Sequence, residues 1–131
     1  MYDYRLWILL KETTEEGDCG QLRVKVDRLR QLVEQKLACV PRDCIYNFNY
    51  STVMQCTGGG NHRGQDHYEL IYVLEWIAES LPGSYGLVYW VDDEDPEVAS
   101  RDQYRVITLA RGRLEERRDP FFSPISQVVG D

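Results

Sequence analysis

Two histidines and two carboxylates lie close together near the middle of the chain, and their types suit acid–base or metal chemistry. They are His62, Asp66, His67 and Glu69. On a helix, residues three or four positions apart share a face, so Asp66 and Glu69 become neighbours while His62 and His67 diverge. The residue types nevertheless leave one alternative function open, a small metal-dependent hydrolase that uses His62, Asp66 and His67. No single helical face collects a full ligand set, so we predict no catalytic residues and no metal site.

Four cysteines invite a zinc or disulfide interpretation: Cys19, Cys39, Cys44 and Cys56. Structural zinc sites use close ligand pairs, most often two cysteines separated by two residues. The spacings here, Cys39-x4-Cys44 and Cys56-x5-His62-x4-His67, do not match that pattern. Reducing compartments keep thiols free, and a chain of this length forms a core without disulfides. We expect the cysteines to pack as small apolar residues, with no cofactor.

Four consecutive carboxylates, Asp92-Asp93-Glu94-Asp95, form the strongest local charge feature. These side chains repel one another, and a protein tolerates such repulsion in a solvated turn or where a basic partner docks. The residues lack the twelve-residue spacing of a calcium-binding loop. The chain has 15 Lys and Arg against 22 Asp and Glu, for a net charge of −7. Such a charge disfavours direct nucleic-acid binding. It either only keeps the protein soluble or also speeds encounter with a basic partner.

A glycine-rich segment, Gly58–Gly64, precedes the second helical pattern and is expected to be a flexible loop. Backbone amides at a helix start can hold an anion. A phosphate-binding loop would need Lys and then Ser or Thr after the last glycine, but Gln65 and Asp66 follow here. The segment is therefore interpreted as a hinge or a partner-contact loop.

The elements that must position these residues follow from the hydrophobic pattern. Residues 1–13 alternate and then become apolar, which predicts a central strand, and branched or aromatic runs predict further strands over 44–48, 50–57, 85–91 and 104–110. Apolar residues at helical spacing predict one helix from about residue 22 to Pro41 and another over 65–81. The first helical stripe consists of Leu22, Val26, Leu29, Val33 and Leu37.

These elements predict an α+β fold in a single domain over residues 1–131. The order is βαββαββ, with two helices packed on a mostly antiparallel or mixed sheet. Residues 114–131 are expected to form a C-terminal tail packed on the body, anchored by Phe121 and Phe122. The N-terminus has no signal-peptide pattern, and no stretch is long enough to span a bilayer, so we expect a cytoplasmic protein without a membrane partner.

Several short motifs occur in a fixed order along the chain, and together they give a resemblance to a known family. They are Asn61-His62-Arg63-Gly64, Pro82-Gly83-Ser84-Tyr85-Gly86-Leu87, Asp92-Asp93-Glu94-Asp95-Pro96, Arg111-Gly112, and Asp119-Pro120-Phe121 with Ser123-Pro124. With this combination of motifs, the chain resembles the immunity protein 7 family. Proteins of this family belong to bacterial polymorphic toxin systems, and these systems act in contact-dependent competition between bacteria. The resemblance covers nearly the whole chain.

The resemblance implies a non-enzymatic cytoplasmic antidote that binds the C-terminal toxic domain of a cognate toxin. Many such toxins are nucleases with basic clefts, which an acidic inhibitor would enter as a phosphate mimic. An adaptor module for another protein remains an alternative, beside the hydrolase. The resemblance implies toxin-binding residues in two loops, namely Asn61, His62, Arg63, Asp92, Asp93, Glu94 and Asp95.

Overall fold

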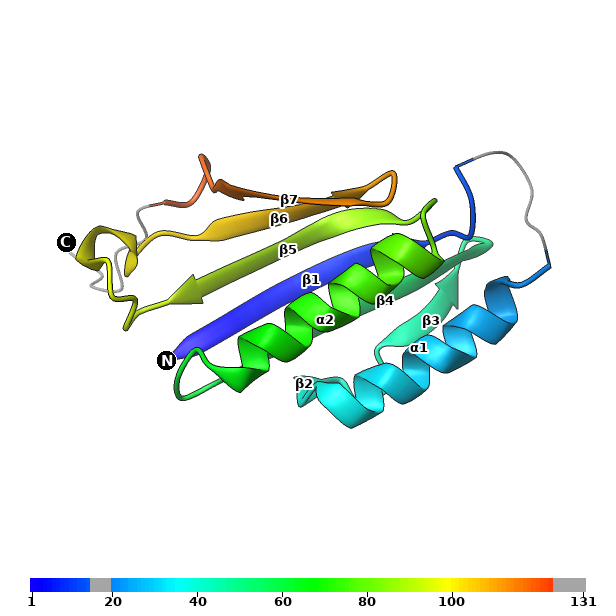
Figure 1. Ribbon diagram of the computed structural model, residues 1–131, viewed down its shortest axis with the longest axis horizontal. Helices are drawn as coiled ribbons and strands as arrows, with labels where there is room; N and C mark the ends of the chain where they lie inside the picture. Colours follow the sequence, from blue (N-terminus) through cyan, green and yellow to red (C-terminus); the bar gives the residue numbers. More distant parts are fainter. Residues whose placement is uncertain (15–19, 124–131) are drawn as a thin grey trace.

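The computed structural model describes residues 1–14 and 20–123, so Cys19 and the end of the predicted 114–131 tail lie outside the described residues. Two helices pack on one seven-stranded sheet in which every strand pair is antiparallel (Figure 1), which confirms the α+β prediction. In chain order the elements are β1 Tyr2–Leu10, α1 Leu22–Lys36, β2 Cys39–Val40, β3 Ile45–Phe48, β4 Ser51–Gly60, α2 Gln65–Ser80, β5 Tyr85–Asp92, a short 3-10 helix Val98–Ser100, β6 Arg105–Ala110 and β7 Arg113–Arg118.

The first strand is central, as its apolar pattern predicts. The sheet order is β2-β4-β1-β5-β6-β7, and β3 pairs with β4 beside β2. Strand β1 pairs with one edge of β4 along nearly its whole length. Strands β2 and β3 pair with the opposite edge of β4, one after the other. Alternate residues of β1 are buried, namely Tyr2, Tyr4, Leu6, Ile8 and Leu10. This alternation turns one face of the sheet toward the helices.

Both helices lie on the same face of the sheet (Figure 1) and enclose the core between them and the strands. Helix α1 ends at Lys36, earlier than predicted, because the backbone at Leu37 is already extended. Side chains at helical spacing face the sheet; in α1 they are Val26, Leu29, Leu32 and Val33, and in α2 they are Leu70, Val73, Leu74, Ile77 and Ala78. Neither helix is long and apolar enough to cross a membrane.

The glycine run 58–60 is part of β4, so the predicted flexible loop is shorter than expected. Gly58 pairs with Tyr4 across the strands. A Cβ atom on Gly58 would lie 2.3 Å from the Tyr4 hydroxyl oxygen. The glycine therefore leaves space for a buried aromatic ring, and only residues 61–64 connect the strand to α2.

Two strands, β2 and β7, were not predicted from the sequence. Strand β7 reads Arg-Leu-Glu-Glu-Arg-Arg and lies at the edge of the sheet, where charged residues are common. The turn before it has Arg111 at φ 52° and Gly112 at φ 72°, which is the backbone of a two-residue hairpin. The predicted tail therefore begins as a sheet strand.

The two phenylalanines of the tail do not anchor it as expected. Residues Phe121 and Phe122 are 78% and 59% exposed, although the ring of Phe122 contacts that of Tyr89. Instead, the buried carboxylate of Asp119 accepts hydrogen bonds from the backbone amides of Phe121 and Phe122. The backbone amide of Asp119 donates a hydrogen bond to the backbone oxygen of Tyr104 at 2.9 Å. A polar turn therefore fixes this segment to the residue that precedes β6.

The sheet face away from the helices carries exposed aromatic side chains. Trp7, Tyr46 and Tyr85 are 45%, 42% and 47% exposed, in strands β1, β3 and β5. Leu9 pairs with Tyr85 on the same face, and Leu87 pairs with Trp7. No helix among the described residues covers this surface, which we call the open sheet face.

Candidate functional site

The two loops implied by the family resemblance meet at one end of the sheet. The reason is the strand register: Tyr2, near the start of β1, pairs with Gly60 at the end of β4 and with Asp92 at the end of β5. The loop 61–64 and the turn 93–95 therefore leave the sheet side by side, next to the N-terminus (Figure 1).

One hydrogen bond and two ion pairs join these loops. His62 Nδ1 lies 2.6 Å from Glu94 Oε2, Arg63 Nη1 lies 3.1 Å from Asp95 Oδ2, and Arg63 Nε lies 3.4 Å from Asp92 Oδ2. We call this group the ion-pair cluster. Each basic residue of the first loop thus contacts carboxylates of the second, so the two predicted contact segments form one structural unit.

The four carboxylates of the acidic turn divide into a buried and an exposed pair. The side chains of Asp92 and Asp95 are only 5% and 7% exposed, whereas those of Asp93 and Glu94 are 41% and 54% exposed. Asp92 accepts a hydrogen bond from the backbone amide of Glu94, and Asp95 accepts one from that of Glu97. Asp92 and Asp95 therefore shape the turn, while Asp93 and Glu94 face solvent.

Basic groups also pair with the two exposed carboxylates. The N-terminal ammonium of Met1 binds Asp93, and this hydrogen bond raises the pKa of the ammonium. The hydrogen bond from His62, followed by the charge of the N-terminus, lowers the pKa of Glu94. The Glu94 carboxylate therefore stays ionised at neutral pH.

Beneath the cluster, Trp90 supports two arginines. The guanidinium carbons of Arg63 and Arg105 lie 5.1 Å and 5.0 Å from the indole centre, within cation–π distance. Arg105 Nη2 also approaches Asp95 Oδ2 at 3.6 Å. The sequence did not identify Trp90 or Arg105 as site residues, because only the pairing of β5 with β6 brings them together at the site.

His67 belongs to this support rather than to a reactive group. Its Nδ1 lies 2.8 Å from the Tyr2 hydroxyl, and its ring packs 4.6 Å from that of Trp90. Burial lowers the pKa of His67 to about 4, with further lowering by the positive charges of Arg63 and Arg105. The imidazole is therefore neutral at physiological pH.

The residues of the hydrolase alternative do not form a metal site. Within residues 1–14 and 20–123, the one group of three or more His, Cys, Asp or Glu ligand atoms in mutual reach is Cys39, Cys44 and Cys56. His62 instead binds Glu94, and His67 binds Tyr2. The thiols of Cys44 and Cys56 lower the pKa of Cys39 by hydrogen bonding.

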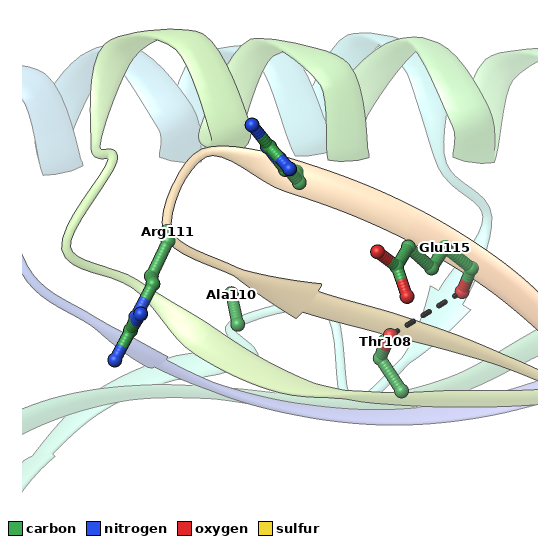
Figure 2. Close-up of a pocket in the computed structure, with 5 residues that line it drawn as sticks. Thr108, Ala110, Arg111 and Glu115 are labelled. Atoms are coloured by element: carbon green, nitrogen blue, oxygen red, sulfur yellow. Dashed lines mark hydrogen bonds between the residues drawn. The ribbon is translucent and has the colours of Figure 1, made fainter.

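A pocket also opens at the β6–β7 hairpin (Figure 2). Its lining comprises Thr108, Ala110, Arg111, Arg113 and Glu115. The Thr108 hydroxyl donates to the backbone oxygen of Glu115 at 3.4 Å. The lining holds neither a histidine nor a cysteine.

Comparison with known proteins identifies a family. No curated protein and no solved structure is similar enough to the chain to count as a match. The family described as Immunity protein 7 matches residues 1–131. The two paired loops, whose motifs resemble that family in the sequence, are part of the matched region. The chain belongs to the immunity protein 7 family.

Proposed function

We propose that the protein binds the toxic domain of a cognate bacterial toxin and neutralises it without catalysis, in the cytoplasm of the producing cell. The observation that carries this proposal is the family match over residues 1–131. The geometry of the ion-pair cluster is consistent with it, because the titratable groups there are paired with one another and are not directed at a common reaction centre. The toxin would be blocked by occupation of its active site or its assembly surface.

The exposed side of the ion-pair cluster is the proposed steering surface. Asn61, His62, Asp93 and Glu94 are exposed, whereas Asp92 and Asp95 are buried and Arg63 is partly buried. The exposed residues would contact the toxin, and the buried ones would hold the two loops in position. The proposal therefore includes all seven predicted loop residues and assigns them different roles.

Charge favours a basic partner, such as the phosphate-binding cleft of a nuclease. The net charge of −7 attracts a basic domain over long range, and Asp93 and Glu94 place carboxylates at the surface. Complementary charge raises association rates more than it raises affinity. Affinity must therefore come from additional apolar contact.

The open sheet face would supply that contact. A stable interface buries about 800 Å² on each partner, more than the exposed residues of two short loops provide. Strand β1 begins at Tyr2, which pairs with Asp92 of the ion-pair cluster, and carries Trp7 on the open sheet face, so the two surfaces are connected. Exposed tryptophans and tyrosines are frequent interface anchors.

Co-expression with the toxic domain encoded beside this gene tests the proposal. The chain should restore growth and co-purify with that domain. Replacing Asp93 and Glu94 by Lys should slow association about tenfold at low salt and flatten its salt dependence. The control is replacement of Glu75 and Glu79, exposed on α2, by Lys, which changes net charge equally. Equal effects of both pairs would refute steering by the cluster, and absence of rescue would refute the function.

A further inference from the structure

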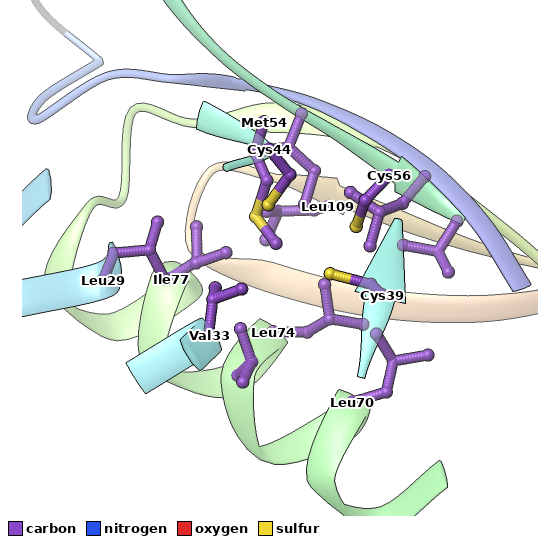
Figure 3. Packing of buried hydrophobic residues seen from close by; sticks show 14 of the residues in the cluster. Leu29, Val33, Cys39, Cys44, Met54, Cys56, Leu70, Leu74, Ile77 and Leu109 are labelled. Atoms are coloured by element: carbon purple, nitrogen blue, oxygen red, sulfur yellow. The ribbon is translucent and has the colours of Figure 1, made fainter. Parts of the chain in front are cut away.

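Three cysteines from separate segments converge at one edge of the core. Cys39 lies in β2, Cys44 immediately precedes β3, and Cys56 lies in β4. Their sulfur atoms all lie within 4.8 Å of one another and all three residues are buried. Figure 3 shows the sulfurs directed into the same space between the sheet and the helices. We call them the cysteine cluster.

The spacing of the sulfurs suits a single metal ion. Metal–sulfur bonds of about 2.3 Å place two thiolates about 3.8 Å apart in tetrahedral geometry and about 4.0 Å apart in trigonal geometry. Sulfurs within 4.8 Å of one another reach these separations by small side-chain movements. A disulfide would need a sulfur–sulfur bond of about 2.0 Å and would leave the third thiol unused.

The cluster also lies where the sheet is weakly joined. Strand β2 pairs with β4 through two residue pairs only, Cys39 with Gly58 and Val40 with Thr57. An ion held by all three sulfurs would connect β2, the segment before β3 and β4. The expected role is therefore a structural clip at this sheet edge.

The donor set determines which ions fit. Thiolates select soft, thiophilic cations and disfavour magnesium, calcium and manganese. Three thiolates satisfy Cu⁺, whereas Zn²⁺ takes a fourth donor, which water can provide. A surface pocket lined by Cys39 and Cys44, with Arg30, Glu34 and Arg42 among its other lining residues, gives ions and water a path to the cluster.

We propose that Cys39, Cys44 and Cys56 together bind one thiophilic d10 cation, Cu⁺ or Zn²⁺. The site is separate from the ion-pair cluster, and nothing in its geometry depends on toxin binding. It predicts a metal-dependent increase in stability, because the native cluster binds the ion with higher affinity than the unfolded chain does.

The test uses reduced protein carrying Cys19→Ser, which leaves only the three cysteines of the cluster. Cu⁺ and Zn²⁺ are titrated in separate experiments, with bound metal measured after dialysis and thiolate-to-metal charge transfer followed by ultraviolet absorption. We expect one equivalent of bound ion, a charge-transfer band and a higher melting temperature. Binding of either cation alone supports the site and identifies its ion. Absence of stoichiometric binding of both overturns the proposal.

Variants and thiol chemistry separate the site from adventitious binding. Adding Cys39→Ser, Cys44→Ser or Cys56→Ser singly should weaken binding at least tenfold, and undiminished binding in these variants overturns the proposal. Circular dichroism checks that each variant folds. Should a variant fail to fold, alkylation of the folded Cys19→Ser protein still decides: metal should protect all three thiols, and unprotected thiols or a disulfide between two of them would refute the site.

Discussion

Arg63 Nη1 lies 3.1 Å from Asp95 Oδ2, although 32 residues separate the two along the chain. The contact links the loop after β4 to the turn after β5, and the buried Asp95 also approaches Arg105. The Asp95 carboxylate therefore helps to hold together two sequence motifs that resemble the family pattern. The shape of the proposed toxin-contact surface depends on this pairing.

Removing the guanidinium should loosen the cluster and destabilise the fold. Arg63→Ala leaves Asp92 and Asp95 buried with one basic partner fewer, so we expect a loss of about 2 kcal/mol in the free energy of unfolding. Urea denaturation measures it. Arg23→Ala, at an exposed position of α1, is the control and should change stability by less than about 0.5 kcal/mol. Similar losses in both variants would contradict a structural role for the Arg63 pairs.

The sequence predicted the fold class because the hydrophobic pattern of β1 and of both helices is regular. It did not predict β7, because the residues of this edge strand are mostly charged and only Leu114 packs against the core. The 58–60 glycines resembled a loop because the space that Gly58 leaves for Tyr4 depends on strand register. Local composition does not specify which strand lies beside them.

The candidate site divides in the same way. The motifs of the 61–64 loop and the acidic turn were visible in the sequence, but their ion pairs depend on Tyr2 pairing with both Gly60 and Asp92. The convergence of the cysteines was also hidden, because pairing of β2 with β4 produces it. Sequence spacing therefore identified the segments, and sheet topology determined their partners.

Acid should destabilise the protein through His67. Its pKa is about 4 in the folded state against an ordinary value of 6.5, so the unfolded chain binds more protons between these values and stability falls as pH falls. Allowing for solvent screening of a partly exposed ring, we expect a loss of about 1 kcal/mol between pH 7 and pH 5. Urea denaturation at both pH values measures it, and His67→Gln should remove this part of the dependence. An unchanged pH dependence in the variant would contradict the assignment.

A side chain at residue 58 should destabilise the sheet. Gly58→Ala places a methyl group against the ring of Tyr4, and overpacking of this kind costs about 2 kcal/mol. Thermal unfolding measures the effect. Tyr4→Leu combined with Gly58→Ala should lose less than the sum of the two single changes, because the smaller side chain relieves the clash. Strict additivity would show that the contact is not the cause.

An anchor on the open sheet face should control affinity for the toxin. Trp7→Ala removes an exposed indole, and we expect a cost of about 2 kcal/mol in binding, or about thirtyfold in Kd, with little change in stability. Calorimetry with the cognate toxin domain measures it. Tyr68→Ala, which removes an exposed aromatic from α2, is the control and should bind normally. Equal losses would place the interface elsewhere.

The stoichiometry of inhibition tests neutralisation by binding most directly. Purified protein is titrated against a fixed amount of the cognate toxin domain, with residual toxin activity measured after equilibration, and the titration is repeated at several toxin concentrations. Binding without catalysis predicts that the amount of protein needed for full inhibition rises in proportion to the toxin, at a constant molar ratio. Full inactivation of the toxin by a small molar fraction of the protein, increasing with incubation time, would show turnover and contradict the account.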